Sequence, residues 1–222
     1  MLIAEIASPC LNLPPELETG ALSRPFNKDC VISALYEVSS QIWPQADAYD
    51  LVVGEDTSGR LSALVIRGVV NAKRSAIGVP AAKIRFISGQ IDVPLPNGFL
   101  PEPEDEQSRA LIVSEYVETG TSISRVRDSM ADTHVWDRGS IDTASISQPN
   151  IHNLITYSSE HLVTSYLYGS GGFKSGAKGV KKDQGPCFSS KLSGCGEEVA
   201  AARASVKAIV ANFSARLVSE RF

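Results

Sequence analysis

The stretch from Arg109 to Met130, RALIVSEYVETGTSISRVRDSM, decides how the chain folds. Ala110 to Val113 form a short apolar run, which is typical of a strand buried on both faces of a sheet. Farther along, Ile123, Val126 and Met130 recur at helical spacing, which indicates an amphipathic helix. The stretch therefore predicts a strand, a loop and a helix.

The loop between this strand and helix has the composition of a phosphate-binding segment. Gly120 lets the backbone approach a ligand closely, and Thr119, Thr121 and Ser122 offer hydroxyl groups as hydrogen-bond donors. The first backbone N–H groups of a helix have no partner within the helix, and they commonly bind anions. The alternative is an ordinary connection in which the hydroxyl groups cap the helix.

A second strand, loop and helix precede the first in the chain. Tyr49 to Val53 predict a buried strand, and apolar residues spaced from Leu61 to Ala72 predict a helix. A further predicted strand, Lys83 to Ile87, separates the two units. This order suits a parallel sheet with right-handed crossovers, in which ligands bind at the carboxyl ends of the strands.

The segment from Val113 to Ser122, VSEYVETGTS, resembles the phosphoribosyl pyrophosphate (PRPP) loop of type I phosphoribosyltransferases. In that family two successive acidic residues hold the ribose hydroxyls, and the hydroxyl and glycine residues that follow bind the 5′-phosphate. The resemblance implies that Glu115 holds the ribose and that Glu118 is a proton acceptor, both as catalytic residues. The residues implied for PRPP or phosphate binding are Ser114, Glu115, Thr119, Gly120, Thr121 and Ser122.

The loop after the first predicted strand, GEDTSGR, resembles the pyrophosphate loop of the same family. The residues implied are Asp56, Thr57, Ser58, Gly59 and Arg60. A bare carboxylate would repel pyrophosphate, so Asp56 is expected to act through a magnesium ion that binds with PRPP. Ser58, Gly59 and Arg60 are expected to contact pyrophosphate directly. The alternative is a loop without function, because glycine and serine before a helix are common.

The resemblance covers roughly residues 27 to 160 and implies an α/β fold with a mainly parallel sheet flanked by helices. We expect residues 1–26 to form an irregular lead-in and residues 27–222 to form one domain. Within that domain the sequence predicts a helix from Asn27 to before Pro44 and strand-like segments at 134–136 and 141–146. It also predicts a further apolar stretch at 154–157 and a C-terminal helix that packs on its own domain.

The stretch from Gly169 to Gly196 is rich in glycine, serine and lysine. One interpretation is a solvated linker. The other is a flap that closes over an anionic substrate and excludes water. The lysines available for that purpose are Lys174, Lys178, Lys181 and Lys182.

Composition limits the remaining classes of function. The chain has 222 residues and a net charge of −4, which argues against indiscriminate nucleic-acid binding. No apolar run is long enough to span a membrane, and the first residues do not resemble a secretory signal. The four cysteines lack metal-binding spacing, so we expect reduced thiols and a cytoplasmic location. The expected partner is a small phosphoribosyl ligand, and a homodimer is compatible with the resemblance.

The activity implied is transfer of the phosphoribosyl group from PRPP to a nitrogenous base. Ser114 stands in the first acidic place of the motif, and its hydroxyl group cannot supply the missing charge, so weak or absent transferase activity is expected. This departure favours an alternative with the same fold, a non-catalytic sensor of PRPP or nucleotide or a subunit of a larger assembly. A third hypothesis is an unrelated phosphate-binding α/β protein.

Overall fold

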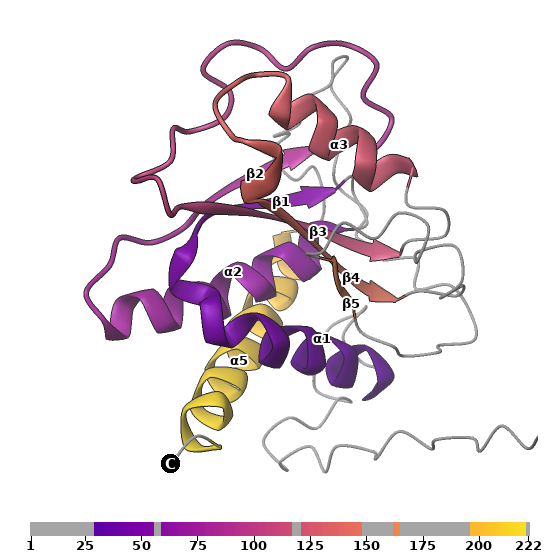
Figure 1. The fold of residues 1–222 in the computed structure, drawn as a ribbon. Coiled ribbons are helices and arrows are strands. Elements are labelled where there is room, and N and C mark those ends of the chain that lie inside the picture. The colour runs from indigo at the N-terminus through magenta and orange to yellow at the C-terminus, as the bar shows by residue number, and fades with distance from the viewer. Residues whose placement is uncertain (1–28, 56–58, 117–120, 148–161, 165–195, 221–222) are drawn as a thin grey trace, which may run out of the picture.

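The computed structural model describes residues 29–55, 59–116, 121–147, 162–164 and 196–220 (Figure 1). In chain order the elements are α1 (Asp29–Ile42), η3 (Trp43–Ala48), β1 (Tyr49–Glu55), α2 (Gly59–Ala76), β2 (Lys83–Ile87), β3 (Arg109–Tyr116), α3 (Thr121–Ala131), η4 (Arg138–Ser140), β4 (Ile141–Ser147), β5 (Leu162–Thr164) and α5 (Gly196–Ser219). A helix separates β1 from β2 and β3 from β4, as expected of parallel strands, whereas β2 and β3 are joined by a connection without a helix.

The sheet contains five strands in the order β2-β1-β3-β4-β5, and every neighbouring pair is parallel. The predicted fold class is therefore confirmed. Gly54 near the end of β1 is in register with Phe86 of β2 and with Val113 of β3. The two predicted loops thus leave the same edge of the sheet from adjacent strands, which we call the carboxyl edge.

Helices cover both faces of the sheet (Figure 1). On one face α1, α2 and α5 pack against strand residues that include Val52, Leu111, Val113, Ala144 and Ile146. On the other face α3 packs against strand residues that include Leu51, Val53, Ala110, Ile112 and Ile141. The residues alternate between the two cores along each central strand. Burial on both faces explains why these strands are continuous apolar runs in the sequence.

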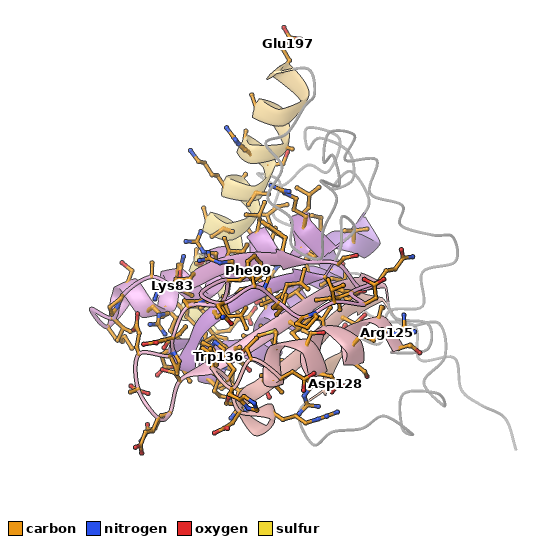
Figure 2. All side chains as sticks on the ribbon, turned by 90° about the horizontal axis from the view of Figure 1, so that it is seen from above. Lys83, Phe99, Arg125, Asp128, Trp136 and Glu197 are labelled. Atoms are coloured by element: carbon orange, nitrogen blue, oxygen red, sulfur yellow. The ribbon has the colours of Figure 1, made fainter. Side chains whose placement is uncertain are left out.

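The C-terminal helix α5 packs on α2 through the apolar stripe seen in the sequence, of which Ile209, Phe213 and Leu217 are buried. A Cβ atom on Gly68 of α2 would lie 2.4 Å from a methyl group of Val210, so the missing side chain lets the two helices approach closely. Figure 2 shows that the amino end of α5, marked by Glu197, projects from the sheet and its covering helices.

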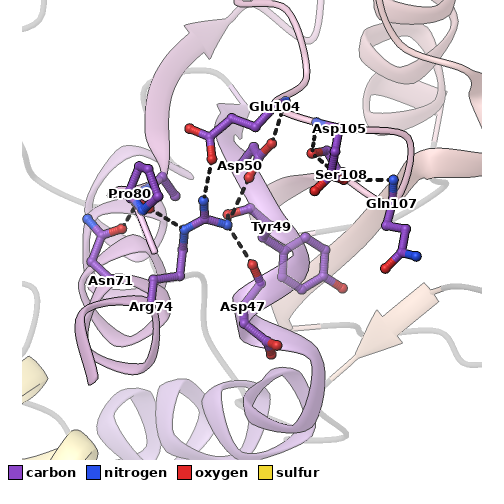
Figure 3. A network of polar contacts seen from close by, with 11 residues as sticks. Asp47, Tyr49, Asp50, Asn71, Arg74, Pro80, Glu104, Asp105, Gln107 and Ser108 are labelled. Atoms are coloured by element: carbon purple, nitrogen blue, oxygen red, sulfur yellow. Dashed lines mark hydrogen bonds and ion pairs between the residues drawn. The ribbon is translucent and has the colours of Figure 1, made fainter. Parts of the chain in front are cut away.

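Buried ion pairs join the elements at the opposite edge of the sheet, where the strands begin (Figure 3). The side chain of Arg74 near the end of α2 is 1% exposed and pairs with Asp50 of β1 and with Glu104, at 2.8 and 3.0 Å. It also donates hydrogen bonds to the carbonyl oxygens of Asp47, Tyr49 and Pro80. Glu104 belongs to the acidic run 102–106, in which Asp105 also accepts hydrogen bonds from Gln107 and Ser108, so the run has a structural role at both residues.

A second buried group lies at the start of β1, β3 and β4. Arg109 binds both carboxylate oxygens of Asp142, at 2.6 and 2.7 Å, and the Tyr49 hydroxyl donates to the same carboxylate at 2.8 Å. Burial, and next the negative charge of Asp142, raise the pKa of Tyr49 far above its usual value. These contacts fix the register of three strands at this edge.

One predicted element is wrong. Residues 134–136 are not a strand but part of the connection after α3, in which His134 has a φ of 58°. Trp136 is 2% exposed, packs in the core beside α3 and donates its indole N–H to the Pro101 carbonyl at 2.9 Å. The apolar pattern there reflects an anchored loop rather than alternation along a strand.

Several predictions fall on residues outside the described ranges, namely the lead-in 1–26, the apolar stretch 154–157 and nearly all of the lysine-rich stretch. Among the helices that are described, none has the length and apolar character needed to cross a membrane.

Candidate functional site

The candidate site lies at the carboxyl edge, where β1 and β3 end side by side. β1 ends at Glu55 and α2 starts at Gly59, whereas β3 ends at Tyr116 and α3 starts at Thr121. The predicted site residues Asp56, Thr57, Ser58, Glu118, Thr119 and Gly120 lie between these elements and outside the described residues. The structure nevertheless brings together the two strand ends and the two helix starts that flank them.

Gly59 places the amino end of α2 directly against β3. A Cβ atom at this position would lie 2.5 Å from the carbonyl oxygen of Val113, closer than any side chain allows. Gly59 was predicted as a pyrophosphate contact, and the structure gives it a packing role as well. Because of this close approach, the first turn of α2 adjoins the strand that leads into the PRPP-like loop.

Arg60 follows Gly59 and lies over the ring of Phe86, with its guanidinium carbon 4.4 Å from the ring centroid. Burial lowers the pKa of Arg60, although an arginine stays charged at neutral pH. Its Nη1 atom is buried and has no hydrogen-bond partner among the described residues. A guanidinium group with an unused donor near the ends of β1 and β2 is suited to binding an anion.

Ser114 has a fully buried side chain, 0% exposed, and it is in register with Ser145 of β4, which is also 0% exposed. Ser114 lies two positions beyond Ile112 and Ser145 four positions beyond Ile141, and because both isoleucines belong to the α3 face, so do both serines. The side chain of Ser114 therefore lies in the interior rather than at the exposed rim of the carboxyl edge. Glu115 is the next residue of β3, and its side chain is outside the described part of the structure.

The starting residues of α3 lie at the rim of the same edge. Thr121 is exposed and Ser122 is half-buried. Their backbone N–H groups belong to the first turn, where a helix has no internal acceptors for them. These two predicted phosphate-binding residues are therefore in a position that an anion can reach.

Glu55 belongs to the predicted loop GEDTSGR but ends β1 in the structure, and no sequence pattern assigns it a role. Its side chain is only 5% exposed. A Cβ atom on Gly89, just after β2, would lie 2.2 Å from Glu55 Oε1 and 2.7 Å from Ser122 Cβ, so the carboxylate and the first turn of α3 approach the same point. A carboxylate at the end of a strand is usually solvated, and only the tertiary structure reveals its burial.

A cavity of about 650 Å³ lies at the other end of α3. It is lined by residues 91–98, Leu100, Ser129 and residues 132–135. None of the predicted site residues is among them. Within the described residues, no three His, Cys, Asp or Glu side chains gather as metal ligands would.

No family model and no curated protein sequence is detectably similar to this chain. Among solved structures, purine phosphoribosyltransferase from Pyrococcus horikoshii Ot3 is 14% identical with a TM-score of 0.40, over 61% of this chain and 82% of that one. Helicobacter pylori xanthine-guanine-hypoxanthine phosphoribosyltransferase is 15% identical with a TM-score of 0.40, over 60% and 79% of the two chains. At this distance the likeness is one of helix and strand arrangement and assigns no activity.

Proposed function

We propose that the chain binds PRPP or a nucleoside 5′-monophosphate at the carboxyl edge of its sheet. The observation that carries the proposal is the convergence of the amino ends of α2 and α3 beside the adjacent ends of β1 and β3. The amino end of a helix offers unpaired N–H groups and a positive partial charge to an anion. Two such ends at one edge suit a ligand that carries phosphate at two positions, as PRPP does with its 5′-phosphate and its pyrophosphate.

The 5′-phosphate is assigned to the start of α3, where Thr121 and Ser122 are accessible. The same phosphate is assigned to Thr119 and Gly120 of the preceding loop. Glu115 at the end of β3 is assigned to the ribose hydroxyls, because a carboxylate accepts two such hydrogen bonds.

The pyrophosphate is assigned to the start of α2. Arg60 supports this assignment because its guanidinium group is half-buried and has an unused donor among the described contacts. Thr57, Ser58 and Gly59 are expected to supply hydroxyl and backbone N–H donors beside it.

Magnesium is expected to bind together with PRPP. Mg²⁺ prefers oxygen ligands and is usually held by one or two carboxylates together with substrate phosphates. The chain supplies carboxylates where the phosphates would bind, with Asp56 as the predicted ligand next to the described Glu55. When bound, the ion would neutralise the charge of the pyrophosphate.

Transfer to a base would require that the protein hold the ribose while pyrophosphate leaves and a nitrogen atom bonds to the anomeric carbon. Glu118 is the proposed acceptor of the proton that the base loses. Ser114 is neutral and buried, so the first carboxylate of the motif is missing from the rim. This observation favours the second candidate function, a protein that senses PRPP or nucleotide and catalyses transfer weakly or not at all.

One labelling experiment can distinguish the two candidate functions. PRPP labelled in its pyrophosphate is incubated with the protein, magnesium and each of a panel of purine and pyrimidine bases, and both retained and released label are measured. Base-dependent release supports a transferase, and retention without release supports a sensor. If no label is retained and none is released, both transfer from PRPP and sensing of PRPP are contradicted.

A further inference from the structure

We propose that Asn97, in the connection between β2 and β3, is a site of spontaneous modification. Its side-chain amide is converted to a carboxylate through attack by the backbone nitrogen of Gly98. Asn97 and Gly98 form the only asparagine–glycine pair in the sequence. Asparagine is a thermolabile residue, and a following glycine hinders the attack least because its Cα carries no side chain. The reaction needs no ligand, so the inference is independent of the proposed function.

The pair occupies the two central positions of a tight turn on the surface. The N–H of Phe99 donates to the Pro96 carbonyl at 3.0 Å, and Gly98 has a φ of 72°, as a type II turn requires there. Asn97 and Gly98 are both exposed, and a Cβ atom on Gly98 would meet nothing within 4 Å. The surroundings therefore leave the Gly98 nitrogen room to reach the Asn97 side chain.

The two reacting groups are also free to move. Among the described residues, none forms a hydrogen bond with the side-chain amide of Asn97 or with the backbone N–H of Gly98. The hydrogen bond from Phe99 closes the turn, and losing such a bond costs little in an exposed segment, where water replaces it. The backbone at Asn97 can therefore rotate into the geometry that the attack requires.

The reaction has two steps. In the first, the Gly98 nitrogen loses its proton and bonds to Cγ of Asn97, while the Cγ–Nδ2 bond breaks and the nitrogen leaves as ammonia with a proton regained from solvent. A cyclic imide remains. In the second, water adds to one of the two imide carbonyl carbons and the bond from that carbon to nitrogen breaks, which gives aspartate or isoaspartate. Because the attacking nitrogen must first lose a proton, the rate rises with pH.

Conversion changes the connection between β2 and β3 in two ways. The new carboxylate joins Asp92 and Asp132 in the lining of the cavity of about 650 Å³, whose lining residues include no lysine or arginine to offset the charge. In isoaspartate the main chain is longer by one methylene group. The added length falls in the turn that places the Phe99 carbonyl 2.8 Å from Arg85 Nε.

Two other described asparagines serve as internal references because both lie in helices. Asn71 of α2 accepts a hydrogen bond from the Ala82 N–H at 2.7 Å, and Asn212 of α5 has a buried Oδ1 atom. A helix must open locally before its backbone nitrogen can attack a side chain. We expect both to be converted at least about tenfold more slowly than Asn97.

The test is peptide mapping by mass spectrometry after the purified full chain is incubated in mildly alkaline buffer. Trypsin releases residues 86–109 as one peptide in which Asn97 is the sole asparagine. An unincubated sample digested in parallel corrects for conversion during digestion. The expected result is a growing fraction of aspartate and isoaspartate at Asn97, formed faster in mildly alkaline than in mildly acidic buffer. The peptides that contain Asn71 and Asn212 should change at least about tenfold more slowly.

Asn97→Gln is the control variant, because the longer side chain of glutamine closes the corresponding ring much more slowly. Its 86–109 peptide is expected to keep its mass. An equal mass increase in this variant would place the conversion at Gln90 or Gln107 of the same peptide and would overturn the inference. Conversion of Asn97 no faster than that of Asn71 in the folded, unchanged protein would also overturn it.

Discussion

Arg60 lies over the ring of Phe86, with its guanidinium carbon 4.4 Å from the ring centroid, and the contact joins the first turn of α2 to β2. The ring holds the guanidinium group through its face and leaves the N–H groups in its plane for an acceptor. Arg60 is therefore oriented before any ligand binds. A preoriented donor loses less entropy on binding than a flexible one.

Replacing Arg60 should affect PRPP more than nucleoside monophosphates, because only PRPP carries a pyrophosphate. Arg60→Gln is expected to weaken PRPP binding about 10- to 100-fold, the value of a hydrogen bond to a charged group. Binding of AMP or GMP should change less than about twofold on the same reasoning. Calorimetry with both ligands measures the difference, and Arg203→Gln on the exposed part of α5 is the control. Equal losses for PRPP and nucleotide would place Arg60 outside the pyrophosphate site.

The close contact between Gly59 and Val113 predicts a loss of stability on substitution. In Gly59→Ala the new Cβ atom would lie 2.5 Å from the backbone oxygen of Val113. That oxygen cannot move unless β3 shifts. The expected cost is about 1 to 3 kcal/mol in the free energy of unfolding, measured by urea denaturation. Gly139→Ala, where a Cβ atom would have no neighbour within 4 Å, is the matched control. A loss no larger in Gly59→Ala than in Gly139→Ala would contradict the described packing.

Ser114→Asp, which restores the missing acidic residue, is expected to destabilise the protein. The new carboxylate would be buried on the α3 face of β3, the same face on which Glu55 lies in neighbouring β1. Like charges buried on the same face repel each other, and burying the new carboxylate is itself costly, so the cost in unfolding free energy should be about 3 kcal/mol or more. Combining Ser114→Asp with Glu55→Gln should recover part of it, which a double-mutant cycle measures. Unchanged stability together with faster release of pyrophosphate would show that Ser114 reaches the ligand.

The sequence predicted the central architecture because hydrophobic periodicity determines it. The strand at 83–87 has the predicted limits, and β3 and α3 flank the loop in the predicted order. The position of the carboxyl ends of β1 and β3 at one edge followed from parallel order alone.

The missed features depend on contacts between residues far apart in the chain. Trp136 looked like part of a strand because its anchoring to the core and to Pro101 is tertiary. No pattern in the sequence singles out Arg74, whose side chain is buried and paired with Asp50 and Glu104. The sequence predicted Glu55 in the loop after β1, whereas it is the last residue of that strand, and its burial against Gly89 depends on where β2 ends.

The Arg74 cluster predicts a large effect at the edge opposite the candidate site. Arg74→Met would leave Asp50 buried without its cation, and the expected loss is about 3 to 5 kcal/mol in unfolding free energy. Adding Asp50→Asn should recover part of that loss, since the unpaired charge is removed. Thermal and urea unfolding test both variants. If Arg74→Met alone is as stable as the unchanged protein, the ion pair does not hold α2 to β1 as described.

The central claim is that a phosphorylated ligand binds at the amino end of α3, and it is tested most directly by calorimetric titration with PRPP and magnesium. Three proteins are compared. They are the unchanged protein, Thr121→Asp at the accessible start of α3, and the control Asn97→Asp, which adds the same charge at an exposed position outside the candidate site. The account predicts binding by the unchanged protein and by Asn97→Asp, and its loss in folded Thr121→Asp through charge repulsion. Equal PRPP affinity in all three proteins would contradict it.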